Sequence, residues 1–180
     1  MLKWFAGIGS RETPEEFISI IYDISKLLID KGYGLRSGAA DGADSYFESA
    51  YNELNGNKEI YIPWRGFNKS SSDLYNQPSK ASEIARKFHV KYDDLSDGAK
   101  KLMARNVQQI LGKDLDNPVD FVLCWTKDGC ESLKTRTRET GGTGLAISLA
   151  SYLHIPVINM KNPLWKETLY SIIGEHDENN

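Results

Sequence analysis

The chain has 180 residues, a net charge of −3 and a pI near 5.7, and its length fits one domain. Hydrophobic residues make up 40% and charged residues 26%, which is typical of a globular protein and excludes a disordered or fibrous one. A dedicated duplex-DNA binder usually has a surplus of basic residues, because it binds by neutralising phosphates. The acidic balance excludes such a surplus over the whole chain and leaves only a local basic patch open.

Several other protein classes are excluded by simple features of the chain. Two cysteines, Cys124 and Cys130, are too few for a disulfide scaffold, and neither they nor the three histidines have metal-ligand spacing. The N-terminus begins with a strand-like pattern rather than a signal peptide. No apolar run approaches the ~20 residues that a membrane span needs. We therefore expect a cytoplasmic protein with no membrane partner, no metal and no cofactor.

Short apolar runs alternate with helical periodicities along the chain, which predicts an α/β fold. Pro14 is expected to open the first helix, with Thr13 as its N-cap. The expected strands are 2–8, 33–37, 59–62, 119–125 and 155–159, and the expected helices are 14–30, 41–54, 80–88, 95–112, 144–153 and 163–173. Strands that alternate with helices at this spacing favour a single-domain, Rossmann-like parallel sheet with helices on both faces. The domain is expected to span 1–174, with a disordered tail at 175–180.

The polar segment 66–80 is rich in serine and asparagine. A loop of this length inside a compact domain is either a lid over a site or a disordered insertion.

Loops with glycine or arginine follow the predicted strands, where open α/β sheets bind their ligands. The first loop contains Gly9, Ser10 and Arg11. Glycine lets the backbone approach a ligand closely, successive N–H groups can cradle phosphate oxygens, and arginine adds a bidentate donor. The alternative is a tight turn that carries a solvated arginine.

The second loop begins with Ser37, Gly38 and Ala39, which are small enough to pack closely on a ligand, and Ser37 can donate a hydrogen bond.

Three carboxylates follow in the same loop and helix. Asp41 either caps the helix or takes part in catalysis. Asp44 and Glu48 lie four residues apart on one helix face. They either bind ribose hydroxyls or solvate the surface.

Aromatic residues also follow predicted strands. Trp64 and Arg65 can stack on a base and pair with a phosphate, or Trp64 is a packed surface residue. Trp125, at the end of the strand 119–125, is the other candidate for base stacking.

The last loop, Gly141, Gly142, Thr143 and Gly144, opens an apolar helix. A glycine-rich helix N-terminus is an anion site, because its N–H groups are free and the helix dipole is positive there. This turn is therefore expected to bind phosphate.

Together these loops resemble the SLOG superfamily, which joins the DprA/Smf DNA-processing proteins to the LOG nucleotide hydrolases. The resemblance is carried by Gly9-Ser10-Arg11, the SGAADGAD stretch at 37–44, the pair Arg105-Asn106 and the GGTG turn at 141–144. It spans residues 4–160 and implies a Rossmann-like fold, a nucleotide pocket that includes Arg105, and a short stand-alone member of the kind common in phages.

Departures from the family pattern shape the expected function. Ser148 stands where LOG hydrolases carry a catalytic glutamate, and serine cannot stabilise an oxocarbenium-like centre as a carboxylate does. The flanking domains and basic composition of DprA are missing as well. The resemblance then implies a small-molecule partner, a nucleotide of the ADP-ribose or cyclic-nucleotide type, that is sensed or sequestered as in counter-defence rather than cleaved.

Two other functions stay open. An N-glycosidase or transferase would need Glu139, Asp41 or Glu48 to replace the missing glutamate. A DprA-like protein would bind single-stranded nucleic acid. The basic run 134–138 either lines the phosphate pocket, contacts such a strand or is a solvated loop.

We also expect a homo-oligomer, as in SLOG relatives. The apolar face of the helix around 102–111 is either its interface or part of the core.

Overall fold

The structure, a computed structural model, describes residues 1–174. Its centre is a five-stranded, all-parallel sheet in the order β3-β2-β1-β4-β5. The strands are β1 (Lys3–Gly9), β2 (Tyr33–Ser37), β3 (Lys58–Ile60), β4 (Phe121–Trp125) and β5 (Val157–Asn159). The predicted single-domain, Rossmann-like α/β fold is confirmed, whereas the predicted tail at 175–180 lies outside the described residues.

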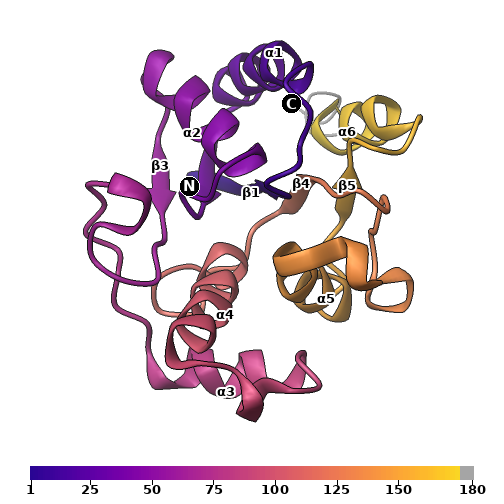
Figure 1. Ribbon diagram of the computed structural model, residues 1–180. Helices are drawn as coiled ribbons and strands as arrows, with labels where there is room; N and C mark the ends of the chain where they lie inside the picture. Colours follow the sequence, from indigo (N-terminus) through magenta and orange to yellow (C-terminus); the bar gives the residue numbers. More distant parts are fainter. Residues whose placement is uncertain (175–180) are drawn as a thin grey trace.

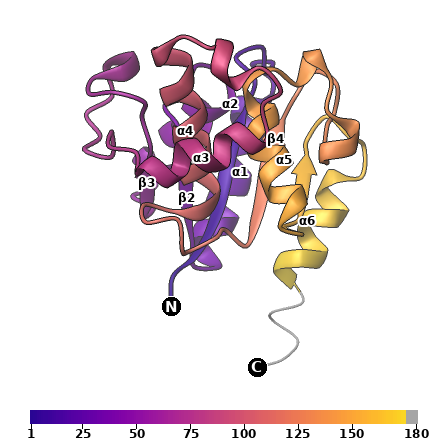
Figure 2. The same ribbon diagram turned by 90° about the horizontal axis from the view of Figure 1, so that it is seen from below.

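Helices cover both faces of the sheet (Figure 1). One face carries α1 (Phe17–Asp30), α2 (Ala43–Glu53) and α6 (Trp165–Gly174), and the other carries α3 (Ser79–Lys87), α4 (Asp97–Leu111) and α5 (Gly144–Tyr152). Figure 2, seen from the α3 side, places α3 in front of α4, so α3 packs on a helix rather than on the sheet. No helix within 1–174 combines the length and the apolar character that a bilayer span requires.

The two central strands alternate between two apolar cores. Phe5 and Phe121 lie in the core under α1, α2 and α6, with ring centroids 5.5 Å apart. Ala6 and Ile8 face the core under α4 and α5. Because both faces are buried, these strands read as nearly continuous apolar runs, which is why their positions could be predicted.

Several predicted boundaries and caps are wrong by a few residues. α1 begins at Phe17 rather than Pro14, and Thr13 does not cap it, because its hydroxyl donates to the Ser10 carbonyl at 2.6 Å. Asp41 is exposed and caps nothing, since α2 follows Gly42, which has φ +80°. An added Cβ at Gly42 would overlap the Ser10 carbonyl oxygen, so glycine is required at this junction.

The segment 66–80 is neither a lid nor a disordered insertion. Phe67 is buried in the core, and the Ser72 hydroxyl donates to the Ile60 carbonyl at 2.5 Å. Ile62 N donates to the Leu74 carbonyl at 3.0 Å. The segment therefore covers the edge of the sheet beside β3, where unpaired strand groups would otherwise be exposed.

The strand order reverses between β1 and β4. The chain runs outward from β1 to β3 on one side, then crosses over to β4 and continues to β5. At such a switch point the loops after the two central strands diverge and leave a crevice, which is where open α/β sheets bind ligands.

At this switch point β1 and β4 approach so closely that residue 9 must lack a side chain. An added Cβ at Gly9 would lie 2.6 Å from the Trp125 carbonyl oxygen and 2.8 Å from Ala43 Cβ. We predict that Gly9→Ala lowers the free energy of unfolding by about 1–3 kcal/mol, because backbone atoms must move. Gly142→Ala, where an added Cβ meets nothing within 4 Å, is the control. Equal urea midpoints for the two variants would contradict this account.

Candidate functional site

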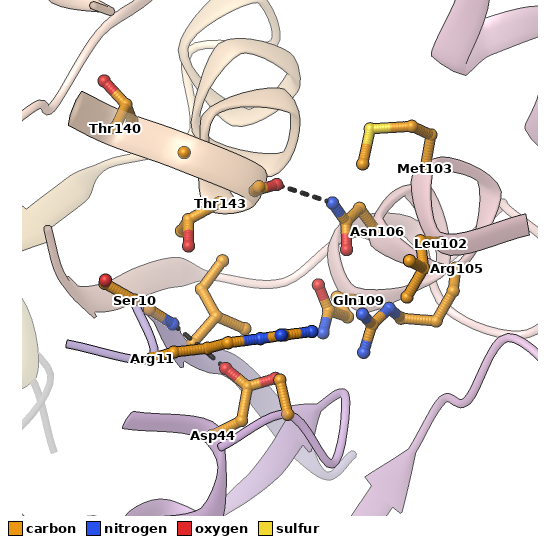
Figure 3. Close-up of a pocket in the computed structure, with 15 residues that line it drawn as sticks. Ser10, Arg11, Asp44, Leu102, Met103, Arg105, Asn106, Gln109, Thr140 and Thr143 are labelled. Carbon is orange, nitrogen blue, oxygen red and sulfur yellow. Dashed lines mark hydrogen bonds between the residues drawn. The ribbon is translucent and has the colours of Figure 1, made fainter. Parts of the chain in front are cut away.

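A pocket of about 310 Å³ opens at the switch point, beyond the carboxyl end of β1 (Figure 3). Four segments build it: the loop after β1, the start of α2 with its preceding loop, one face of α4, and the turn before α5. Its lining residues are Ile8, Gly9, Ser10, Arg11, Ala40, Asp44, Leu102, Met103, Arg105, Asn106, Gln109, Thr140, Gly141, Gly142 and Thr143.

The side chain of Asp44 joins the first two of these segments. One carboxylate oxygen accepts from Gly9 N at 3.0 Å and the other from Gly38 N at 3.1 Å, and Ala40 N also donates to this carboxylate. The residue is only 3% exposed, so it does not solvate the surface, which was one sequence-based alternative. Asp44 fixes the loops after β1 and β2 relative to each other.

The charge of Asp44 is balanced by opposing effects. Burial raises its pKa to about 6, whereas Arg105 and the N–H groups of Gly9, Ala40 and Gly38 act to lower it. Among residues 1–174, it is the only carboxylate that lines the pocket. Its negative charge therefore interacts with Arg105 and with backbone N–H groups of the protein itself.

Arg105 enters the pocket from α4 and is 5% exposed. Its Nη1 donates to the Gly38 carbonyl, while its Nε has no hydrogen-bond partner among the described residues. An added Cβ at Gly38 would overlap this guanidinium, so glycine is needed there to admit the arginine. Burial lowers the pKa of Arg105, Asp44 raises it, and Arg11 lowers it further; an arginine nevertheless stays charged.

Arg11 supplies a second guanidinium to the same pocket. Figure 3 shows its exposed side chain extending across the pocket toward Gln109 and Arg105. Its neighbour Ser10 serves the turn itself, because the Ser10 hydroxyl accepts from Glu12 N at 3.0 Å. Two guanidinium groups thus share a wall with one carboxylate, which gives the pocket a net positive charge.

The glycine turn closes the pocket opposite Arg11. Asp128 holds this turn by accepting from the hydroxyls of Thr137 and Thr140, at 2.7 Å for Thr137 and 2.5 Å for Thr140. On the other side, Asn106 Nδ2 donates to the Gly142 carbonyl at 2.9 Å, the bond drawn beside α4 in Figure 3. An added Cβ at Gly141 or Gly142 meets nothing within 4 Å, so open space lies above both.

Eight of the residues predicted to bind a ligand line this pocket. They are Gly9, Ser10, Arg11, Asp44, Arg105, Gly141, Gly142 and Thr143.

Three other predicted residues lie behind the wall. The Ser37 hydroxyl donates to the Gly7 carbonyl at 2.6 Å, and Ala39 is buried in the core. Gly144 is buried beneath Arg136, whose Nε lies 2.5 Å from the position of an added Cβ. None of the three lines the pocket. Gly38 does not line it either, but its N–H donates to Asp44 and its carbonyl accepts from Arg105.

The predicted aromatic platforms are also elsewhere. Trp64 packs edge-on against Phe67, and neither it nor the exposed Arg65 lines the pocket. Trp125 is 5% exposed and belongs to the core, where it contacts Phe17. No aromatic side chain of the described part of the chain lines this pocket. The residues after β3 run along the sheet edge, and the Trp125 ring packs in the core.

The carboxylates considered for catalysis lie outside the pocket as well. Asp41 and Glu139 are exposed. Glu48 is half-buried, which raises its pKa, and interacts with Lys58 rather than with the pocket. Ser148 is fully buried, and its hydroxyl donates to the Gly144 carbonyl at 2.7 Å.

Sequence reasoning missed most of the α4 wall. Leu102, Asn106 and Gln109 recur at helical spacing, and this was the available signal. On this helix, only Arg105 was predicted as a pocket residue. Residues 104–111 are all buried within the single chain and pack as part of its core. The expected homo-oligomer stays a prediction.

Comparisons with known proteins give no related site with which this pocket can be compared. No protein-family model matches the chain, and neither a curated protein nor a solved structure matches it. Within residues 1–174, no group of three or more His, Cys, Asp or Glu side chains is arranged to hold a metal ion. The interpretation of the site rests on its own geometry and charge.

Asp44 gives this site a testable pH dependence. Its folded pKa of about 6 lies above the ordinary value of 3.8, so folding takes up a proton between these values. The contribution of Asp44 to stability is therefore fully present below pH 3.8 and is lost as the pH rises through 6. Asparagine cannot titrate. We predict that lowering the pH from 7.5 to 5 shifts the difference in unfolding free energy between wild type and Asp44→Asn in favour of wild type.

Urea titrations of both proteins at the two pH values measure this difference, and the other titrating groups cancel between them. A shift in favour of Asp44→Asn at pH 5 would mean that the N–H donors and Arg105 outweigh burial.

Proposed function

We propose that the pocket binds a phosphorylated nucleotide of the ADP-ribose or cyclic-nucleotide type and releases it unchanged. The protein would act in the cytoplasm as a sensor or as a sequestering protein that counters nucleotide signalling. We propose in the same sense that the chain is a member of the SLOG superfamily. One observation carries the binding proposal: Arg105 is buried in the pocket wall with an unused Nε donor, and Arg11 faces the same space.

Charge balance favours an anion over a neutral ligand. The single lining carboxylate, Asp44, already accepts from three backbone N–H groups. Because two guanidinium groups face one carboxylate that is already hydrogen-bonded, the pocket keeps an excess of positive charge that a phosphate can neutralise. Arginine binds phosphate through paired, charge-assisted hydrogen bonds.

The shape of the pocket fits a phosphate and its sugar. Gly9 and Gly142 both line the pocket, and the lack of side chains there lets a ligand approach the backbone closely. A volume of about 310 Å³ lies at the lower end of the range for small-molecule sites. With no aromatic residue in the wall, a base can contact Leu102 and Met103 or stack on the Arg11 guanidinium.

The proposal predicts distinct effects of variants on ligand affinity. Loss of a charge-assisted hydrogen bond costs about 1.5–3 kcal/mol, so Arg11→Ala should weaken ADP-ribose or cyclic AMP binding about tenfold or more in calorimetry. Gly142→Val should weaken it as well, because the side chain fills space where a phosphate would approach. Arg65→Ala removes an exposed arginine outside the pocket and is the matched control.

If both pocket variants bind like wild type while remaining folded, the assignment of the site is wrong. If Arg65→Ala alone weakens binding, the ligand lies beyond β3 instead.

A second candidate is an N-glycosidase, and one observation favours it. Asp44 lines the pocket with a pKa raised to about 6, which is a common property of catalytic acids and bases. We prefer binding without turnover, because both oxygens of Asp44 are held by backbone N–H groups. A carboxylate placed at the developing cation is worth several kcal/mol of barrier, and the other carboxylates considered for this role lie outside the pocket.

Product analysis distinguishes the two candidates. We predict that wild-type protein incubated with excess ADP-ribose or cyclic AMP and then denatured returns the ligand intact. Multiple-turnover release of free base or ribose phosphate, abolished in Asp44→Asn, would establish the enzyme instead.

A further inference from the structure

A second hollow, the basic groove, adjoins the pocket. It has a volume of about 930 Å³ and is lined by residues 86–91, at the end of α3 and beyond it, and by Leu133 and residues 136–138 of the loop after β4. Five of its lining residues are cationic: Arg86, Lys87, Lys91, Arg136 and Arg138. None of the described residues that line it is acidic, although the chain as a whole carries a charge of −3. The sequence showed only the run 134–138, because residues 86–91 join it through the fold.

The floor of the basic groove is fixed by one of its arginines. Arg136 Nη1 donates to the Phe88 carbonyl at 2.7 Å and to the Ser148 hydroxyl at 3.3 Å. This arginine ties the loop after β4 to the end of α3 and to α5. The groove is therefore built from packed segments rather than from side chains that meet only at the surface.

Three cations of the groove are available to a ligand. Arg86 forms an ion pair with Asp93 at 3.1 Å. Lys87, Lys91 and Arg138 are exposed, and none makes an ion pair with another residue of 1–174. Positive charge gathered without acidic partners repels itself, and an anion that binds there relieves the repulsion.

The basic groove and the pocket share Gly141 as a wall. An added Cβ at Gly141 would meet nothing within 4 Å, so the backbone there is a low rim between the two hollows. A ligand held by Arg11 and Arg105 on one side can pass over this rim and reach Arg138 on the other.

We propose that the basic groove is a second phosphate subsite, so that the ligand is a dinucleotide with two separated phosphate groups. The inference rests on the proposed function, since the pocket holds the first phosphate. A dinucleotide fits better than a long polyanion, because the pocket at one end is closed by α4 and Asp44. Beyond the groove, a chain of net negative charge offers a long strand little attraction.

The test compares AMP with 5′-phosphorylated diadenylate in calorimetric titrations of the whole chain. The groove variant is Lys91→Gln/Arg138→Gln, and the matched control is Lys26→Gln/Lys166→Gln, which removes the same charge from exposed positions on α1 and α6 across the sheet. Wild type and control should bind diadenylate at least tenfold more tightly than AMP. The groove variant should lose this advantage and keep its affinity for AMP.

Four results would overturn the inference. Equal affinities of wild type for the two probes, or a parallel loss of both in the groove variant, reject the second subsite while leaving the pocket intact. If wild type binds neither AMP nor diadenylate, the proposed function is rejected and this inference with it. A twelve-residue oligodeoxyadenylate that binds far more tightly than diadenylate, with a salt slope well above the value of about 1.4 for two phosphates, would make the groove a nucleic-acid surface.

Discussion

The candidate site depends on one buried carboxylate. Asp44 accepts hydrogen bonds from the N–H of Gly9, at the end of β1, and from the N–H of Gly38, just after β2. Burying an ionised carboxylate is costly unless hydrogen bonds and a counter-charge compensate it. Here the compensation comes from those N–H groups and from Arg105, so the charge that fixes the two loops also draws an arginine into the pocket wall.

This arrangement explains why glycines gather at the switch point. Gly9 must lack a side chain because backbone atoms of β4 lie too close, whereas an added Cβ at Gly38 would displace the Arg105 guanidinium from its place. Gly141 and Gly142 differ, since an added Cβ at either meets nothing. The first two glycines serve the packing of the protein on itself, whereas the last two leave room for something else. The sequence alone does not separate these two kinds of glycine.

Asp44 and Arg105 also clarify what the pocket can and cannot do. A carboxylate whose oxygens are both engaged by the backbone is well placed to hold loops and poorly placed to move. Arg105 is in the opposite position, because its Nε has no hydrogen-bond partner among the described residues. This contrast favours recognition of an anion over chemistry on it.

Much of the fold could be predicted because it follows from local patterns. Buried strands such as 33–37 are short apolar runs, and their alternation with helices requires a parallel sheet. Caps were harder to predict: Thr13 and Asp41 are good capping residues, but the tight turn at Ser10 and Gly42 takes over both junctions. That turn depends on a contact between loops that are distant in sequence.

Of the pocket wall, the sequence predicted the loop after β1, the glycine turn before α5, Asp44 and Arg105. Trp64 and Trp125 follow strands as a stacking residue would, yet the orientation of each ring is set by neighbouring packing, against Phe67 and Phe17. Asn106 and Gln109 were missed because polar residues within an apolar helix resemble an ordinary amphipathic pattern. Their role depends on the crossing of α4 over the switch point, which is a tertiary feature.

The central claim is that Arg105 is held in the pocket wall to donate a hydrogen bond to a ligand phosphate. Nuclear magnetic resonance of its side-chain Nε–H tests this claim most directly. In a titration of ¹⁵N-labelled protein with ADP-ribose or cyclic AMP, the account predicts that this resonance shifts saturably together with the amides of Gly9 and Gly142. If saturating amounts of both nucleotides leave the Arg105 Nε–H resonance unchanged, the pocket does not bind a nucleotide phosphate and the account is wrong.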